Sequence, residues 1–197
     1  MRKILDLIVA ILMLAAIGCS NQGGAPRPYG YHRITFPEKE YQPLPDSFPY
    51  FFEYPVYGKI IKDSSVMSEP YWIDIHFPGY RGNIHLSYKP LKNNLTQYME
   101  DARDMAYKHS VKADAIEEEV VYRENDKVYG IVYDIQGDAA SSLQCFLTDR
   151  ANHFLRGALY FRSRANRDSL QPVISFFKKD VQHLIETTDW QHKAGNS

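Results

Sequence analysis

The chain has 197 residues, of which 44% are hydrophobic, with 23 basic and 24 acidic side chains. This length suits one domain with a well-formed core. The balanced charge provides neither a basic face for nucleic acid nor a strong field for an anionic surface, so neither is expected as a partner.

Residues 1–18 are predicted to be a signal peptide. Basic residues precede a short apolar run over residues 7–17, and a membrane-spanning helix needs about 20 apolar residues. Cys19 directly follows an Ile-Gly pair, the pattern at which bacterial lipoproteins are cut before the cysteine and acylated, typically with palmitate-length chains. The alternative is an ordinary secreted protein. Several acyl chains would make Cys19 a stable membrane anchor.

Residues 19–28 form the lipidated cysteine and a small, polar tether. Lipoproteins displayed at the cell surface tend to carry an acidic run after the cysteine, and an aspartate at position 20 favours retention at the inner membrane. This chain has no acidic run there, and Ser20 stands at the second position. We therefore expect the inner leaflet of the outer membrane, with the domain facing the periplasm.

Residues 29–49 are predicted to form an extended arm, because prolines recur through it and exclude a helix. Tyr29, Tyr31 and Arg33 are the candidate partner surface, since tyrosine and arginine are enriched at the centres of protein interfaces. A purely structural arm that packs on its own domain would need the same aromatic residues, so both interpretations stay open.

Residues 50–190 are predicted to form a single domain, followed by a disordered tail over residues 191–197. Strands are predicted over residues 51–54, 58–62, 71–77, 83–88, 116–123, 128–136, 139–148 and 153–162. Helices are predicted from residue 94 to about 110–112 and over residues 169–187. This order indicates an α+β fold, a twisted and mostly antiparallel sheet with two main helices packed on it, and it resembles the PsbP-like sandwich.

Apolar stripes at helical spacing define the two predicted helices. Asn94 is the expected N-cap of the first helix, with Gln97 at the capping-box position, and Pro172 is expected in the first turn of the second helix. The stripe of the first helix comprises Leu95, Tyr98, Met99, Ala102, Met105, Ala106 and His109. The stripe of the second comprises Leu170, Val173, Ile174, Phe177, Val181, Leu184 and Ile185.

The predicted hairpin over residues 71–88 places Asp74 opposite His85 if Ile75 faces Ile84. Ser87 would share their face, so a Ser-His-Asp triad is one interpretation. Nothing in the sequence resembles a nucleophile elbow, however, and a flat sheet face rarely presents a strained serine. We therefore interpret Asp74 and His85 as a structural cross-strand pair.

Metal and cofactor sites are not expected. His76 and His85 could share a metal with Asp74, but a site needs three or four converging ligands, and no other His or Cys has suitable spacing. His109 fits a buried histidine on its helix, and Cys145 fits a small buried hydrophobe without a disulfide partner. There is also no glycine-rich nucleotide motif. No catalytic residue, metal or cofactor is predicted, and the chain is not expected to be an enzyme.

Taken together, several segments resemble the GldD gliding-motility lipoprotein family of Bacteroidetes, beginning with the arm sequence PRPYGYHRI. The matching segments are residues 26–34, 36–41, 52–55, 84–90, 107–109, 112–118 and 153–161. The resemblance implies an accessory protein for gliding motility and the associated type IX secretion machinery, acting through other envelope proteins. The family supplies no catalytic residues. A module that binds a small glycan or lipid fragment on an aromatic sheet face is the alternative, and a hydrolase using Asp74 and His85 is a distant third.

Overall fold

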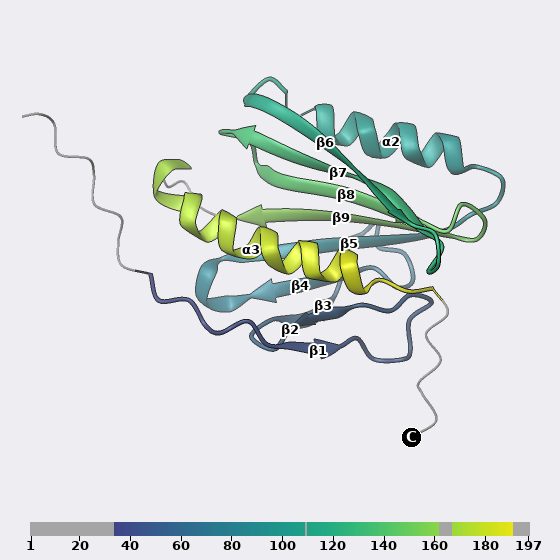
Figure 1. The fold of residues 1–197 in the computed structure, drawn as a ribbon, viewed down its shortest axis with the longest axis horizontal. Helices are drawn as coiled ribbons and strands as arrows, with labels where there is room; N and C mark the ends of the chain where they lie inside the picture. Colours follow the sequence, from purple (N-terminus) through teal and green to yellow (C-terminus); the bar gives the residue numbers. More distant parts are fainter. Residues whose placement is uncertain (1–33, 109, 162–166, 191–197) are drawn as a thin grey trace, which may run out of the picture. The chain divides into compact units, whose positions relative to one another are not determined.

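Two antiparallel sheets and two helices make up the described part of the chain, as the computed structural model in Figure 1 shows. The structure describes residues 34–108, 110–161 and 167–190, and Ile34 begins the compact unit. The elements are β1 (Tyr41–Pro43), β2 (Glu53–Pro55), β3 (Lys59–Lys62), β4 (Ile73–Phe77), the 3-10 helix η1 (Pro78–Tyr80), β5 (Gly82–Pro90), α2 (Leu95–Tyr107), β6 (Ala113–Arg123), β7 (Val128–Gly137), β8 (Ser141–Thr148), β9 (His153–Phe161) and α3 (Arg167–Thr187).

The larger sheet has the order β3-β4-β5-β9-β8-β7-β6, and β1 pairs with β2 in a second, small sheet. Every pair of neighbours is antiparallel. The predicted α+β class is therefore confirmed. Neither described helix combines the length and apolar composition needed to cross a bilayer.

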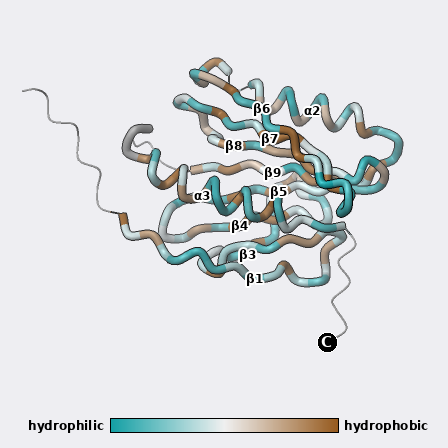
Figure 2. Tube along the Cα trace, viewed as in Figure 1, coloured by the Kyte–Doolittle hydropathy of each residue, from teal (hydrophilic) through white to brown (hydrophobic). Residues whose placement is uncertain are grey.

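Alternation along the strands divides the large sheet into two apolar faces. One face packs against α3, where Ile75, Ile84 and Leu159 join Phe177 and Val181 in the main core. On the other face, α2 contributes to a smaller core. The members of this smaller core are Ala102, Ala106, Tyr133, Ile135, Phe146 and Phe154. Along α3 in Figure 2, hydrophilic and hydrophobic colours alternate, as expected for a helix with one buried face.

The second half of the arm packs on the domain. Tyr41–Pro43 form β1, which the sequence analysis did not predict, and pair with Glu53–Pro55. Leu44 is buried in the main core. These backbone and core contacts attach residues 41–44 to the sheet and to α3.

α2 differs from its prediction in three ways. It ends at Tyr107, three to five residues earlier than predicted. Met99 and Met105 are exposed rather than buried, because the narrow stripe of Ala102 and Ala106 is the part that meets the sheet. Asn94 stands at the N-cap but makes no side-chain bond to the helix. Its Oδ1 instead accepts a hydrogen bond from the Lys92 backbone N–H, at 2.8 Å.

Other boundaries shift for local reasons. β4 begins at Ile73 because Tyr71 has a left-handed backbone, with φ of 69°, and the Tyr50 hydroxyl donates a hydrogen bond to the Tyr71 carbonyl at 2.6 Å. β6 begins at Ala113, where a bulge opposes Gly137, whose φ of 118° favours glycine. α3 begins at Arg167, so Pro172 lies inside the helix rather than in its first turn.

Candidate functional site

The residues predicted to carry the membrane anchor and the partner surface lie outside the described residues. These are Cys19, Tyr29, Tyr31 and Arg33, and His109 of the first predicted helix is also outside. Their roles stay predictions.

Asp74 and His85 form the cross-strand pair that alternation predicted. They are opposite each other in the register of β4 and β5, next to the pair of Ile75 and Ile84. His85 Nδ1 lies 2.9 Å from Asp74 Oδ1, and the two side chains are 24% and 30% exposed. The rings of Trp72 and His85 are nearly perpendicular to each other, with 5.9 Å between their centroids. The pair is therefore a half-buried polar contact, held between neighbouring strands.

Ser87 and His76 are placed differently from ligands or nucleophiles. Ser87 is 8% exposed and lies within a regular strand, opposite Arg156, whereas a nucleophilic serine stands on a sharp exposed turn. His76 lines an open cavity of about 520 Å³ together with Asp74, Arg81 and other residues of the β4–β5 hairpin. Within the described residues, no group of three His, Cys, Asp or Glu side chains is placed to hold a metal.

Cys145 is a buried hydrophobe, as predicted. Its side chain belongs to the main core on the same face as Leu143 and Leu147. Burial raises the pKa of the Cys145 thiol to about 11, so the group stays protonated at neutral pH and lacks the thiolate that reacts.

A polar cluster that the sequence analysis did not predict surrounds the buried carboxylate of Asp180 on α3. Asp180 is fully buried, and its Oδ1 accepts hydrogen bonds from Lys39 Nζ at 2.7 Å and from the Tyr41 hydroxyl at 3.1 Å. The Tyr57 hydroxyl lies 2.7 Å from Oδ2 and 2.9 Å from Oδ1. One carboxylate thus receives donors from two segments that lie over 120 residues away in the sequence.

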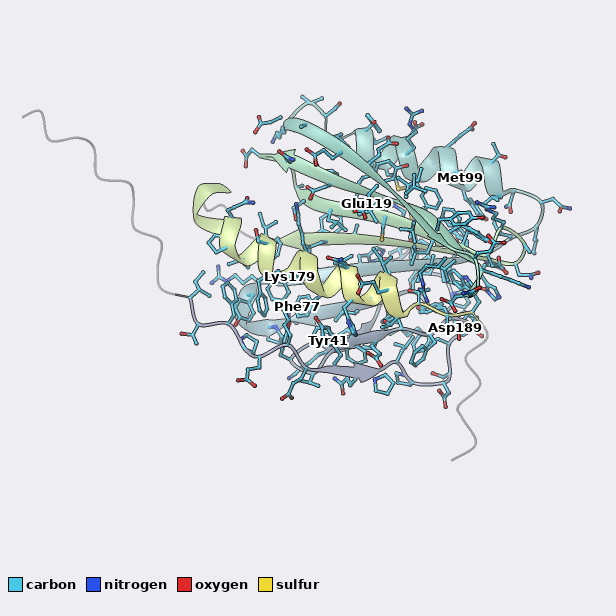
Figure 3. The ribbon with its side chains drawn as sticks, viewed as in Figure 1. Tyr41, Phe77, Met99, Glu119, Lys179 and Asp189 are labelled. Carbon is cyan, nitrogen blue, oxygen red and sulfur yellow. The ribbon has the colours of Figure 1, made fainter. Side chains whose placement is uncertain are left out.

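Aromatic rings surround this cluster. Lys39 Nζ lies 3.2 Å from the centre of the Phe176 ring, which also stacks on Phe36 at 4.4 Å between centroids. Tyr41 stacks on His183 at 3.5 Å, and Figure 3 shows Tyr41 between β1 and α3. These contacts fasten the described end of the arm to α3.

The surroundings of the cluster keep the hydroxyl groups of Tyr41 and Tyr57 protonated. Burial lowers the pKa of the Lys39 ammonium, although the hydrogen bond and charge of Asp180 act in the opposite direction. Burial, with the hydrogen bond and charge of Asp180, raises the pKa of Tyr57 and of Tyr41. Both phenols therefore remain donors at neutral pH, and the cluster is a structural clamp between the arm and α3.

One signal for this clamp was present in the sequence. Asp180 follows Phe177 by three residues and precedes Leu184 by four, so it lies on the buried stripe of the helix. A carboxylate on such a stripe needs a buried partner. The sequence alone does not identify Lys39 as that partner, because 141 residues separate the two.

Exposed apolar side chains gather on α2 and β6. Half of the twelve large apolar side chains that are exposed in the described residues lie within residues 99–122, on α2, on β6 or in the connection between them. They are Met99, Met105, Tyr107, Val111, Val120 and Tyr122. The Tyr107 hydroxyl donates a hydrogen bond to Glu118 at 2.8 Å, which links the end of the helix to the strand. We call these six residues the α2–β6 surface.

Comparisons with known proteins identify a family and a solved structure with some similarity. The family described as Gliding motility lipoprotein GldD matches residues 21–190. The solution structure of cyanobacterial PsbP from Synechocystis sp. PCC 6803 is similar, with 15% sequence identity and a TM-score of 0.46 over 79% of this chain and 97% of that chain. No curated protein matches the sequence significantly.

Proposed function

Because the chain belongs to the GldD family of gliding motility lipoproteins, we propose that it is a non-catalytic accessory protein that supports gliding motility and the associated type IX secretion machinery by binding other proteins. The family itself implies a role in gliding motility and a lipid-anchored place in the cell envelope. We further propose that the anchor lies in the inner leaflet of the outer membrane and that the domain faces the periplasm.

The α2–β6 surface is the observation that supports protein binding. Single exposed apolar residues are normal on soluble proteins, but a group of them on neighbouring elements is typical of interaction sites. Val120 and Tyr122 are 72% and 62% exposed, although each has the size of a core residue. Burying such side chains against a partner removes apolar area from water, which favours association.

Site-specific photocrosslinking in living cells tests this proposal. A photoreactive residue at Val120 on the α2–β6 surface is compared with one at Tyr31 in the arm. The control position is Val66, which is fully exposed and lies in the β3–β4 connection. Crosslinks from Val120 or Tyr31 to motility or secretion proteins, and not from Val66, are expected. Equal crosslinking from all three positions would contradict the proposal.

The anchor is tested by Cys19→Ala. We expect a soluble protein or a precursor that keeps its signal peptide, because the acyl chains supply the membrane affinity. Membrane fractions are washed without detergent and probed for the protein. A variant that is processed normally and remains membrane-bound would refute the lipid anchor.

A small-ligand binding module is the second candidate, and a cavity favours it. A cavity of about 740 Å³ lies beside the β3–β4 connection, and its aromatic lining comes from Phe48, Tyr71 and Trp72. Serines 64, 65 and 68 add hydroxyl groups to the lining, and aromatic rings combined with hydroxyls suit a sugar ring. Calorimetric titration with envelope glycan fragments, repeated on Trp72→Ala, tests it. Heat that persists unchanged in the variant would exclude this cavity as the binding site.

A further inference from the structure

β6 is a long strand at the edge of the large sheet. It spans eleven residues, Ala113–Arg123, and is the terminal strand of the sheet order. In the part of the chain that the structure describes, no strand pairs with its outer side. The opposite edge, β3, has only four residues and carries Lys59 and Lys62 at its two ends, which is a common way to prevent strand pairing. β6 therefore offers the longer edge for an added strand.

A groove lies along β6 on the face of the sheet that α3 covers. It has a volume of about 520 Å³. Its apolar floor comprises Val121, Val132, Leu143 and Ile185. Glu119 on β6 and Lys179 on α3 line the groove from its two sides, and both are labelled in Figure 3. Side chains of an added strand that point toward α3 would enter this groove.

The other face of β6 is apolar near its end. Val120 and Tyr122 pair in register with Ile131 and Tyr129 of β7, and both are largely exposed. Successive side chains of a strand point to opposite faces. An added strand therefore contacts the groove with one set of side chains and Val120 with the other set.

We propose that β6 binds an extended, basic segment of a partner protein as an eighth strand of the sheet. This proposal rests on the proposed function, and it specifies how the partner is recognised. Main-chain hydrogen bonds provide affinity in such strand addition, while alternate side chains provide specificity.

The negative charge of β6 and of the groove favours a basic partner segment. Glu117, Glu118 and Glu119 are consecutive on β6 and exposed, and Glu186 of α3 adds a further carboxylate to the groove. Of the basic residues that line the groove, Lys178 forms an ion pair with Asp134 and Arg123 with Asp126, so the glutamates outnumber the remaining Lys179. Lysine or arginine opposite these glutamates is favourable, whereas like charges opposite each other are unfavourable. The same rule disfavours antiparallel pairing of β6 with a second copy centred on Glu118.

Peptide binding to the purified, lipidated protein in detergent tests the proposal. The probe is a labelled eight-residue peptide of alternating valine and lysine with blocked ends, followed by fluorescence anisotropy. Glu117→Lys combined with Glu119→Lys is expected to weaken binding at least tenfold and to favour a valine–glutamate peptide. The matched control is Glu100→Lys with Asp101→Lys, two exposed acids on α2, which should leave binding unchanged. Equal weakening in both variants would overturn the proposal.

Methylated peptides separate strand pairing from general attraction of charge. Two probes carry N-methyl groups on alternate residues, in the odd or in the even positions. An added strand uses only one of its edges, so one probe should lose binding at least tenfold while the other binds as before. Retention of binding by both probes, or formation of a β6-mediated dimer in sedimentation, would overturn the proposal. Crosslinks from Val120 in cells without peptide binding would overturn strand addition but leave the proposed function intact.

Discussion

Two polar contacts to a carboxylate are similar in distance but differ in their surroundings. Lys39 Nζ lies 2.7 Å from Asp180, and His85 Nδ1 lies 2.9 Å from Asp74. Asp180 is fully buried, whereas Asp74 and His85 are both about one quarter exposed or more. The first contact joins the arm to α3, and the second joins two adjacent strands that the backbone already pairs.

The difference shows how burial, rather than distance, determines how much a polar contact to a carboxylate contributes to stability. A buried carboxylate that loses a partner cannot regain the hydrogen bonds of water, so the loss is large. A half-exposed pair regains them, and its attraction is screened. The clamp around Asp180 should therefore control stability, and the Asp74–His85 pair should have a small effect.

Lys39→Met should give the largest loss. It leaves the buried Asp180 carboxylate without its cation, and removing one partner of a buried pair costs about 3 kcal/mol or more. Urea unfolding measures the change. The double variant Lys39→Met with Asp180→Asn should recover more than half of the loss, because the amide oxygen still accepts from Tyr57. A loss below about 1 kcal/mol, the scale of one neutral hydrogen bond, would contradict the clamp.

Tyr57→Phe should give the next largest loss. The Tyr57 hydroxyl lies within 2.9 Å of both oxygens of Asp180, and a hydrogen bond to a charged group contributes about 2 kcal/mol. Tyr41→Phe is the matched control, because its hydroxyl reaches only Oδ1, at 3.1 Å. The expected order of unfolding midpoints is wild type, Tyr41→Phe and then Tyr57→Phe. The reverse order would show that Tyr41 makes the stronger bond.

Local patterns account for what the sequence predicted correctly. The period of two in the hairpin, with Ile75 facing Ile84, placed Asp74 opposite His85, and the same alternation placed Cys145 in the core. The stripe of α3 predicted the burial of Phe177, Val181 and Leu184. Each of these inferences depends on residues that are close in the sequence.

The parts that the sequence did not predict depend on distant contacts. β1 has three residues and exists through its pairing with β2, which begins ten residues later. Met99 and Met105 fit the helical stripe, but α2 contacts the sheet through Leu95, Tyr98, Ala102 and Ala106, and the two methionines are exposed. Lys39 and Asp180 are 141 residues apart and meet only in the folded chain. Tertiary packing, which local periodicity does not contain, decides these features.

His85→Ala should give a small loss. The imidazole makes one hydrogen bond to Asp74 at 2.9 Å, so the expected destabilisation is about 1 kcal/mol. Cellular function, measured by complementation at matched protein abundance, should remain intact. Complementation that fails with folded and abundant protein would instead support the hydrolase interpretation of Asp74 and His85.

The smallest expected effect is a dependence of stability on pH that comes from His153, whose side chain is partly buried. Burial lowers the pKa of His153 although Asp149 acts in the opposite direction, and the ring stacks on Trp190 at 5.3 Å. The folded state therefore binds a proton less readily than the unfolded state, whose histidines titrate near about 6.5. The neutral imidazole therefore makes its full contribution to stability above that pH, and this contribution is lost as the pH falls below it.

Urea midpoints at pH 7.5 and 5.5 measure this dependence. The wild type should be less stable at the lower pH, and His153→Gln should reduce the difference between the two midpoints, because it removes the titrating group. Asp149 does not interfere in this range. Burial opposes its ionisation, but hydrogen bonds from the backbone N–H groups of residues 151–153 lower its pKa below the usual value, so it titrates at more acidic pH. An unchanged difference in His153→Gln would show that another group causes the loss of stability.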